Sequence, residues 1–166
     1  MQRFRFVVGG LLVVLASAVA SYYAASAAVP STLRPAGTTR YAVAGAQNQV
    51  TTQSTSFIPI PDMSQSIVIP SGKRGDVFVT FCGMSTIDLN SASLNVRAMV
   101  GNSLTMPEYV TLTSDTDESQ TRCASFYKLN VAAGTKNIRM DWRITNGTAT
   151  QYMYGRTMFV IVNLHN

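Results

Sequence analysis

The sequence has few charged residues, one histidine and two cysteines, and these shortages exclude several classes of protein. Charged residues make up 13% of the chain and hydrophobic residues 46%, whereas a disordered chain needs the opposite balance. Serine catalysis with a histidine base would depend on His165 alone. Because His165 is the penultimate residue, we expect it to be a dangling terminal residue. The sequence also lacks a glycine-rich phosphate loop and a zinc motif. We therefore expect no enzyme, no cofactor and no metal.

The basic residues are scattered rather than clustered. The formal net charge is +5, and removal of Arg3 and Arg5 with the leader described below reduces it by two, to +3. Proteins that bind nucleic acids usually concentrate Lys and Arg in one stripe, whereas Arg97, Arg139 and Arg143 are dispersed here. We expect no nucleic-acid partner.

The first 27 residues have the three parts of a secretory signal peptide. Arg3 and Arg5 precede the apolar run 7–20, and an Ala-Ser-Ala segment then permits cleavage after Ala27. The alternative is an uncleaved N-terminal membrane anchor, although the run is shorter than the about 20 residues that span a bilayer. Both interpretations place the rest of the chain outside the cytoplasm. A membrane is a partner only if the leader is retained.

After the leader, composition separates a linker from a strand-rich domain. Residues 28–56 are rich in Ala, Gly, Thr, Gln and Ser, and we interpret them as a flexible linker with Tyr41–Ala44 as a candidate first strand. From residue 57 onward, short apolar runs alternate with turn residues. The predicted strands are 57–60, 66–69, 76–84, 92–100, 103–106, 109–113, 121–131, 136–144 and 156–164.

Alternation of apolar and polar residues predicts sheets with one covered face. Ile138 and Met140 alternate with Arg139 and Asp141, and we place the latter two on the solvent side. Two such sheets that pack face to face form an antiparallel sandwich. We predict an all-β, two-sheet jelly roll over residues 57–166, with an immunoglobulin-like sandwich as the alternative.

The last predicted strand is apolar on both faces. Met158, Val160 and Val162 share one face, whereas Phe159 and Ile161 share the other. An exposed apolar face usually marks an interaction site. Phe159 and Ile161 are therefore either covered within the chain, by the N-terminal segment, or form an interface between subunits.

The two cysteines predict a disulfide between Cys82 and Cys123, because an exported chain with one pair usually oxidises it. Cys123 shares a strand face with Tyr127 and Leu129, which we assign to the core side. We therefore expect a buried bridge, between the sheets or between neighbouring strands. The alternative is two separate buried thiols. Two sulfurs without a nearby histidine do not make a metal site.

Two loops raise hypotheses about ligands. Asp115, Asp117 and Glu118 cluster in a Ser/Thr-rich loop, which either binds calcium or, as we favour, is a plain solvated loop. Tyr152 and Tyr154 occupy an expected loop tip or strand start, where they either stack on sugar rings or, as we favour, pack at the rim or in the core.

A glycoside hydrolase needs two carboxylates about 5–10 Å apart. Nothing in the spacing of the acidic residues selects such a pair. The candidates are Asp62, Asp76, Asp88, Glu108 and Asp141.

The C-terminal part of the chain resembles secreted bacterial proteins that have an AGTHTV-x-V-x-W strand, a Gly/Thr turn and a final RTL-x-V strand. Asn137 stands where those proteins have His, and Met158 where they have Leu. The resemblance covers residues 57–166. It implies a single jelly-roll domain related to the C1q/TNF-like superfamily, and a trimer formed through the sheet that holds the last strand. It brings no catalytic residues, and the chain lacks a collagen-like stalk. The segments that carry the resemblance are VAAGTKNIRMDWR (131–143), GTAT (147–150) and GRTMFV (155–160).

Together these features predict a secreted, non-enzymatic binding or structural module, for which the resemblance implies a homotrimer. A carbohydrate-binding module is the second hypothesis, and a glycoside hydrolase is the third. The partners that we expect are further copies of the chain and an extracellular protein or glycan ligand.

Overall fold

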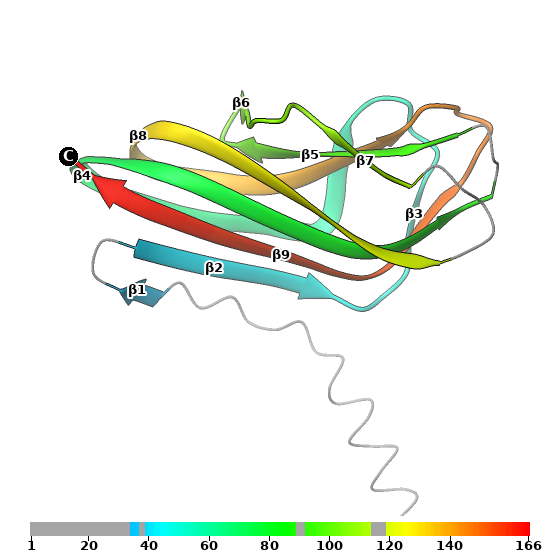
Figure 1. Ribbon diagram of the computed structural model, residues 1–166, viewed down its shortest axis with the longest axis horizontal. Coiled ribbons are helices and arrows are strands. Elements are labelled where there is room, and N and C mark those ends of the chain that lie inside the picture. Colours follow the sequence, from blue (N-terminus) through cyan, green and yellow to red (C-terminus); the bar gives the residue numbers. More distant parts are fainter. Residues whose placement is uncertain (1–33, 37–38, 89–91, 114–118) are drawn as a thin grey trace, which may run out of the picture.

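The computed structural model describes residues 34–36, 39–88, 92–113 and 119–166. Within these ranges the chain forms strands, turns and loops but no helix (Figure 1). The leader predicted over residues 1–27 lies outside them, and the described part has no helix long and apolar enough to cross a membrane. The strands are β1 (Arg34–Ala36), β2 (Thr39–Ala46), β3 (Val50–Thr52), β4 (Ile58–Ile87), β5 (Leu94–Val100), β6 (Ser103–Leu104), β7 (Val110–Thr113), β8 (Gln120–Ile144) and β9 (Gln151–His165).

All strand pairs are antiparallel, and backbone hydrogen bonds join the strands in the order β1-β2-β9-β4-β8-β5-β6, with β3 on β9 and β7 on β5. β4 and β8 are the longest strands, and they pair with each other over both of their halves. Residues 58–69 of β4 pair with 134–142 of β8, and residues 74–85 pair with 120–132.

A bend in β4 and β8 carries both strands from one layer of the molecule to the other (Figure 1). The register of the pair shifts between Ile69 and Arg74. Gly72, Asn130 and Gly134 have positive φ angles of 75°, 58° and 113° at this bend, a conformation that glycine adopts at little cost.

The bend divides the sheet into two layers. We call the first the β9 layer: it contains β2, β9, residues 74–87 of β4 and residues 120–132 of β8. We call the second the β5 layer: it contains β5, β6, β7, residues 58–69 of β4 and residues 134–144 of β8. The prediction of an all-β, antiparallel fold with two packed layers is confirmed.

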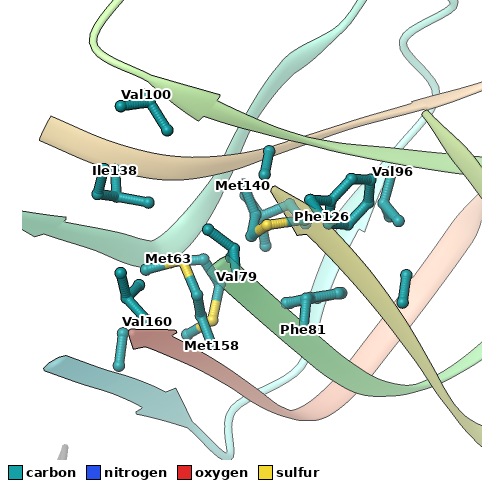
Figure 2. Packing of buried hydrophobic residues seen from close by; sticks show 14 of the residues in the cluster. Met63, Val79, Phe81, Val96, Val100, Phe126, Ile138, Met140, Met158 and Val160 are labelled. Carbon is teal, nitrogen blue, oxygen red and sulfur yellow. The ribbon is translucent and has the colours of Figure 1, made fainter. Parts of the chain in front are cut away.

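The hydrophobic core lies between the two layers (Figure 2). Val79, Phe81 and Val160 of the β9 layer share one buried cluster with Met63 and Met140 of the β5 layer. Burial of each such side chain contributes about 1.5–3 kcal/mol to the stability of the fold. Ile138 and Met140, which alternation predicts to face inward, are buried, and the inward row continues through buried Trp142 and Ile144.

The prediction of a flexible linker over residues 28–56 is wrong for residues 39–52. They contain β2 and β3, which both pair with β9, and the candidate strand at Tyr41–Ala44 falls inside β2. Ala42 and Ala44 are buried in the core. Alanine gives only a weak strand pattern in the sequence because its side chain is small, yet it fits well where a strand packs closely on the opposite layer.

The expectation that Asp141 faces solvent is wrong, because its exposed fraction is only 1%. Its carboxylate accepts hydrogen bonds from Arg139 Nε at 2.9 Å and from Arg97 Nη2 at 3.1 Å. The Arg97 guanidinium in turn lies 4.2 Å from the centre of the Phe57 ring. Alternation gave the correct side of the strand, but the two long arginine side chains cover the carboxylate there.

A buried arginine of β9 joins the loop between β2 and β3 to the irregular part of β4 between Pro59 and Ser64. Arg156 is fully buried, and it donates hydrogen bonds to Pro61 O at 3.1 Å, Asn48 O at 2.6 Å and Asp62 Oδ2 at 3.2 Å. Desolvation lowers the pKa of Arg156, and the Asp62 carboxylate partly offsets this effect. The guanidinium thus supplies the backbone carbonyls of Asn48 and Pro61 with donors that water cannot provide.

Gly75 leaves no room for a side chain beside the bend. A Cβ atom there would lie 2.8 Å from Val162 Cγ1 and 2.9 Å from Ile69 Cδ1. We predict that Gly75→Ala lowers the free energy of unfolding by about 1–3 kcal/mol, the usual cost of overpacking, as measured by chemical denaturation. The control Gly83→Ala should cost less, because its Cβ would meet the flexible Met153 side chain at 3.3 Å. An equal loss in both variants would contradict this role of Gly75.

Candidate functional site

A row of apolar side chains crosses the outer face of the β9 layer. The strand register places Tyr41 opposite Ile161, Ile161 opposite Phe78, and Phe78 opposite Tyr127. Met106 extends the row through a bridge with Tyr127. Phe78, Tyr127 and Met106 have exposed fractions of 40%, 43% and 58%, so a large part of this apolar surface faces solvent.

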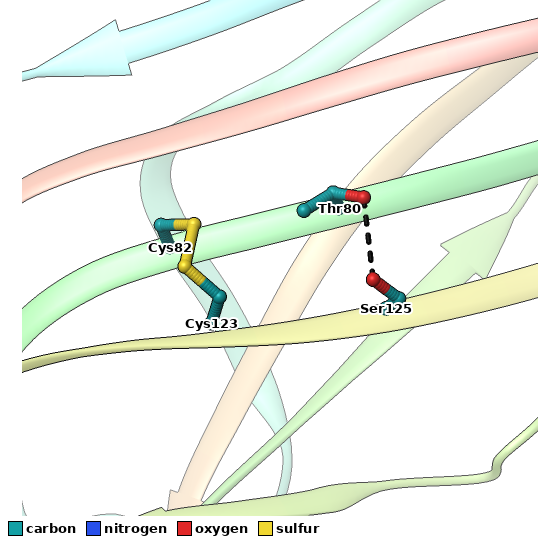
Figure 3. The surroundings of a disulfide bond; sticks show 4 residues. All are labelled: Thr80, Cys82, Cys123 and Ser125. Atoms are coloured by element: carbon teal, nitrogen blue, oxygen red, sulfur yellow. Dashed lines mark hydrogen bonds between the residues drawn. A yellow bond between two sulfur atoms is a disulfide. The ribbon is translucent and has the colours of Figure 1, made fainter.

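A second row lies beside the first. Val43 is opposite Phe159, Phe159 is opposite Thr80, and Thr80 is opposite Ser125. The ring of Phe159 stacks on that of Tyr41 with 6.5 Å between their centres. Thr80 Oγ1 and Ser125 Oγ form a hydrogen bond of 3.3 Å (Figure 3). Neither row contains a charged residue, and we call the two rows together the apolar face.

Sequence reasoning singled out only two members of the apolar face. Phe159 and Ile161 lie on it, while their neighbours along β9, Val160 among them, point into the core. It missed Phe78, and it assigned Tyr127 to the core side. The sequence does contain a pattern that identifies the outward positions. Val77, Val79 and Phe81 are the more strongly apolar set of this strand, and the outward residues alternate with them.

Cys82 and Cys123 form the predicted disulfide, with an S–S distance of 2.04 Å (Figure 3). The two residues stand directly opposite each other on β4 and β8, so the bridge joins neighbouring strands. The expectation that it is buried is wrong: Cys123 is exposed and Cys82 is half-buried. The inward positions of β8 are taken by Ala124 and Phe126, which turns Cys123 to the outer face.

Tyr152 and Tyr154 lie inside β9 near its beginning, so they occupy the strand start and not the loop tip, the two placements that the sequence left open. Tyr152 pairs with Thr86 and Tyr154 with Met84, and both tyrosines are half-buried. The strand begins at Gln151, whose buried side chain donates a hydrogen bond from Nε2 to Thr86 O at 2.6 Å. A buried glutamine carries no apolar signal, so the pattern in the sequence placed the start of the strand too late.

His165 is not the dangling terminal residue that we expected. It belongs to β9, opposite Arg74, and its Nε2 lies 3.3 Å from Asp76 Oδ1. Asp76 also accepts a hydrogen bond from Asn130 N at 2.9 Å. The hydrogen bond from Asn130 and, to a smaller extent, His165 lower the pKa of Asp76, although desolvation opposes them.

The other candidate carboxylates of a hydrolase are dispersed. Asp62 pairs with Arg156, Asp88 accepts a hydrogen bond from Thr150 N at 2.6 Å, and Glu108 is exposed. In the ranges that the structure describes, no group of three or more His, Cys, Asp or Glu residues could hold a metal ion. The loop proposed for calcium lies outside these ranges, with Asp115, Asp117 and Glu118.

Comparison with known proteins places the fold but not a family. No protein-family model matches the chain, and no curated protein does. Among solved structures, the VP2 subviral particle of infectious bursal disease virus is similar, with a TM-score of 0.50 and 10% identity over 83% of this chain and 38% of that chain. The C-terminal CBM6 of LamC, a marine laminarinase from Zobellia galactanivorans, gives a TM-score of 0.35 and 8% identity over 79% and 89%. At 10% identity, the likeness to VP2 shows the jelly-roll-like fold alone. This chain also spans less than two fifths of the VP2 chain.

The disulfide generates a prediction about stability. Cys82 and Cys123 are separated by 41 residues, and in the chain-entropy model a bridge over such a loop stabilises the fold by about 4 kcal/mol. The double variant Cys82→Ser/Cys123→Ser should lose about that free energy of unfolding in chemical denaturation. The wild-type mass should also increase by two hydrogens on reduction.

The matched control removes the neighbouring cross-strand pair. Thr80→Ala/Ser125→Ala deletes an exposed hydrogen bond between the same two strands, and we expect it to cost no more than about 1 kcal/mol. An unchanged mass on reduction, or equal losses in the two double variants, would contradict the stabilising role of the bridge.

Proposed function

We propose that the chain is a secreted, non-enzymatic binding or structural module with a C1q/TNF-like jelly roll, and that it acts as a homotrimer assembled through the apolar face. The apolar face is the observation that carries this proposal. Its aromatic and aliphatic side chains form a continuous row across the β9 layer, with Phe78 40% exposed. Exposed patches of this kind usually mark interaction sites, and aromatic residues and Met are enriched at the centres of protein interfaces.

Other copies of the same chain are the partners that best fit the apolar face. The two rows contain no charged residue, so two such faces do not repel each other when they meet. Phe78, Tyr127 and Phe159 offer the rigid aromatic anchors that contribute most to binding energy at interfaces. The resemblance to the C1q/TNF-like superfamily implies a trimer through the sheet with the last strand, and Phe159 lies in that strand.

Export of the chain is supported by two independent features. Residues 1–27 have the pattern of a secretory leader. The Cys82–Cys123 disulfide is exposed on the sheet surface, and such bonds persist in oxidising compartments outside the cytoplasm. A non-enzymatic role is supported by the carboxylates, because Asp62, Asp76 and Asp141 hold neighbouring structural groups together.

The homotrimer is tested by light scattering on the mature protein, residues 28–166, at micromolar concentration. We predict the mass of three chains for the wild type and of one chain for Phe78→Ser/Phe159→Ser. Loss of an aromatic anchor at an interface costs about 2 kcal/mol or more, which weakens association about 30-fold for each residue.

The control for this experiment is Val68→Ser. Val68 is an apolar residue of similar exposure, 48%, but it lies on the β5 layer, so its loss should leave the mass unchanged. A wild-type monomer would contradict the homotrimer. A trimer that survives the double substitution would contradict the assignment of its interface to the apolar face.

A further inference from the structure

The end of the molecule at which β4 and β8 bend has a solvent-accessible pocket of about 310 Å³. It lies between the Gly101-Asn102 turn that joins β5 to β6 and the bend of β8. Ligand pockets in proteins usually measure about 300–1,000 Å³, so this pocket has room for one small chemical group such as a sugar ring. Its lining includes Asn102, Ser103 and Asn130.

Two lysines occupy positions that point toward the space between the layers. Lys128 follows Phe126 on the inward side of β8, and Lys136 precedes Ile138 on the inward side after the bend; both lysines line the pocket. An ammonium group at the end of a core row must reach water or a polar partner. The side chains at these two positions therefore bring positive charge to the mouth of the sandwich.

The partners of these lysines leave their charge uncompensated. Lys128 Nζ donates a hydrogen bond to the backbone carbonyl of Leu104 at 3.1 Å, and a carbonyl carries no formal charge. The ammonium group of Lys136 makes no hydrogen bond or ion pair with any residue that the structure describes. No acidic residue is among the residues that line the pocket.

A second hollow of about 290 Å³ adjoins the first across Ala132, which lines both. Its lining includes Lys73 and Arg74 and again no acidic residue. Lys73 Nζ donates to Asn166 Oδ1, and Arg74 Nη1 donates to Asn130 O at 3.1 Å. Four basic side chains are thus gathered around one bend of β8, and the partners that the structure gives three of them are neutral oxygens.

We propose that the two hollows form one binding site for an acidic saccharide, a sugar chain that bears sulfate or carboxylate groups. We call it the bend site. Lys128 and Lys136 supply charge for the anionic group, while Asn102 and Ser103 supply amide and hydroxyl groups that suit the sugar hydroxyls. An anionic membrane shares the charge but is flat, whereas the bend site is recessed and suits a protruding group.

The bend site adds a ligand to the proposed binding module but does not depend on the homotrimer. All of its lining residues belong to one chain, and none belongs to the apolar face. A monomeric Phe78→Ser/Phe159→Ser variant should therefore keep the affinity of the bend site for a short saccharide. Loss of assembly and loss of ligand binding can in this way be told apart.

The test is a titration of the mature protein, followed by NMR, with three tetrasaccharides in low salt. A heparin-derived tetrasaccharide provides sulfate, tetragalacturonate provides carboxylate, and maltotetraose is the neutral probe. We expect at least one acidic probe to bind with shifts at Asn102, Asn130 and Lys136, and to weaken with added salt. Maltotetraose should not bind. Vesicles of phosphatidylcholine and phosphatidylglycerol test the membrane as the alternative source of negative charge.

Matched variants decide whether binding is local. Lys136→Gln should weaken binding of the acidic probe about tenfold, the usual cost of one charge-assisted hydrogen bond. Arg122→Gln removes the same charge from β8 away from the bend, where Arg122 Nη2 contacts Gln120 Oε1 at 2.9 Å, and should change the affinity less than twofold. Both variants should keep the wild-type circular dichroism spectrum.

Three results would overturn the proposal. One is the absence of binding to both acidic tetrasaccharides. Another is an equal loss of affinity in Lys136→Gln and Arg122→Gln, which would indicate diffuse surface charge instead of a site. The last is binding to the vesicles without binding to either acidic tetrasaccharide.

Discussion

β4 and β8 stay paired with each other while both pass from one layer to the other, and this shared passage determines the rest of the structure. It satisfies the backbone hydrogen bonds of both layers and leaves one flank of β4 for β9 and one flank of β8 for β5. It also requires a bend, where Gly72 and Gly134 take positive φ and Gly75 admits close contact with Val162. The core, the apolar face and the bend site all follow from where this pair of strands runs.

The β9 layer is apolar on both sides, but only its inner side is buried within the chain. Its inner side, with Val79 and Phe81, is buried against the β5 layer and stabilises the chain as a monomer. On its outer side, Phe78 and Tyr127 are exposed to water. Their burial can contribute hydrophobic free energy only when another surface covers them. The Cys82–Cys123 disulfide joins β4 to β8 beside that surface.

Sequence alternation predicted the fold wherever one side of a strand was clearly polar, as around Trp142. It failed where both sides are apolar, because a shift of one residue then exchanges core and surface without changing the pattern; the misplacement of Tyr127 is an example. It also failed for buried polar groups such as Arg156, whose partners Asn48 and Asp62 are far from it in the sequence. The bend site depends in the same way on contacts between distant segments, so no local pattern could indicate it.

In the proposed homotrimer, copies of the chain cover the apolar face. Hydroxyl-radical footprinting tests this directly, since it measures the oxidation rate of individual side chains as the mature protein is diluted. We expect Phe78, Tyr127 and Phe159 to be protected at high concentration and to become reactive on dilution. Tyr109, which is 45% exposed outside the apolar face, should react equally throughout. If the three face residues are oxidised at a rate that does not depend on protein concentration, no other copy of the chain covers the apolar face.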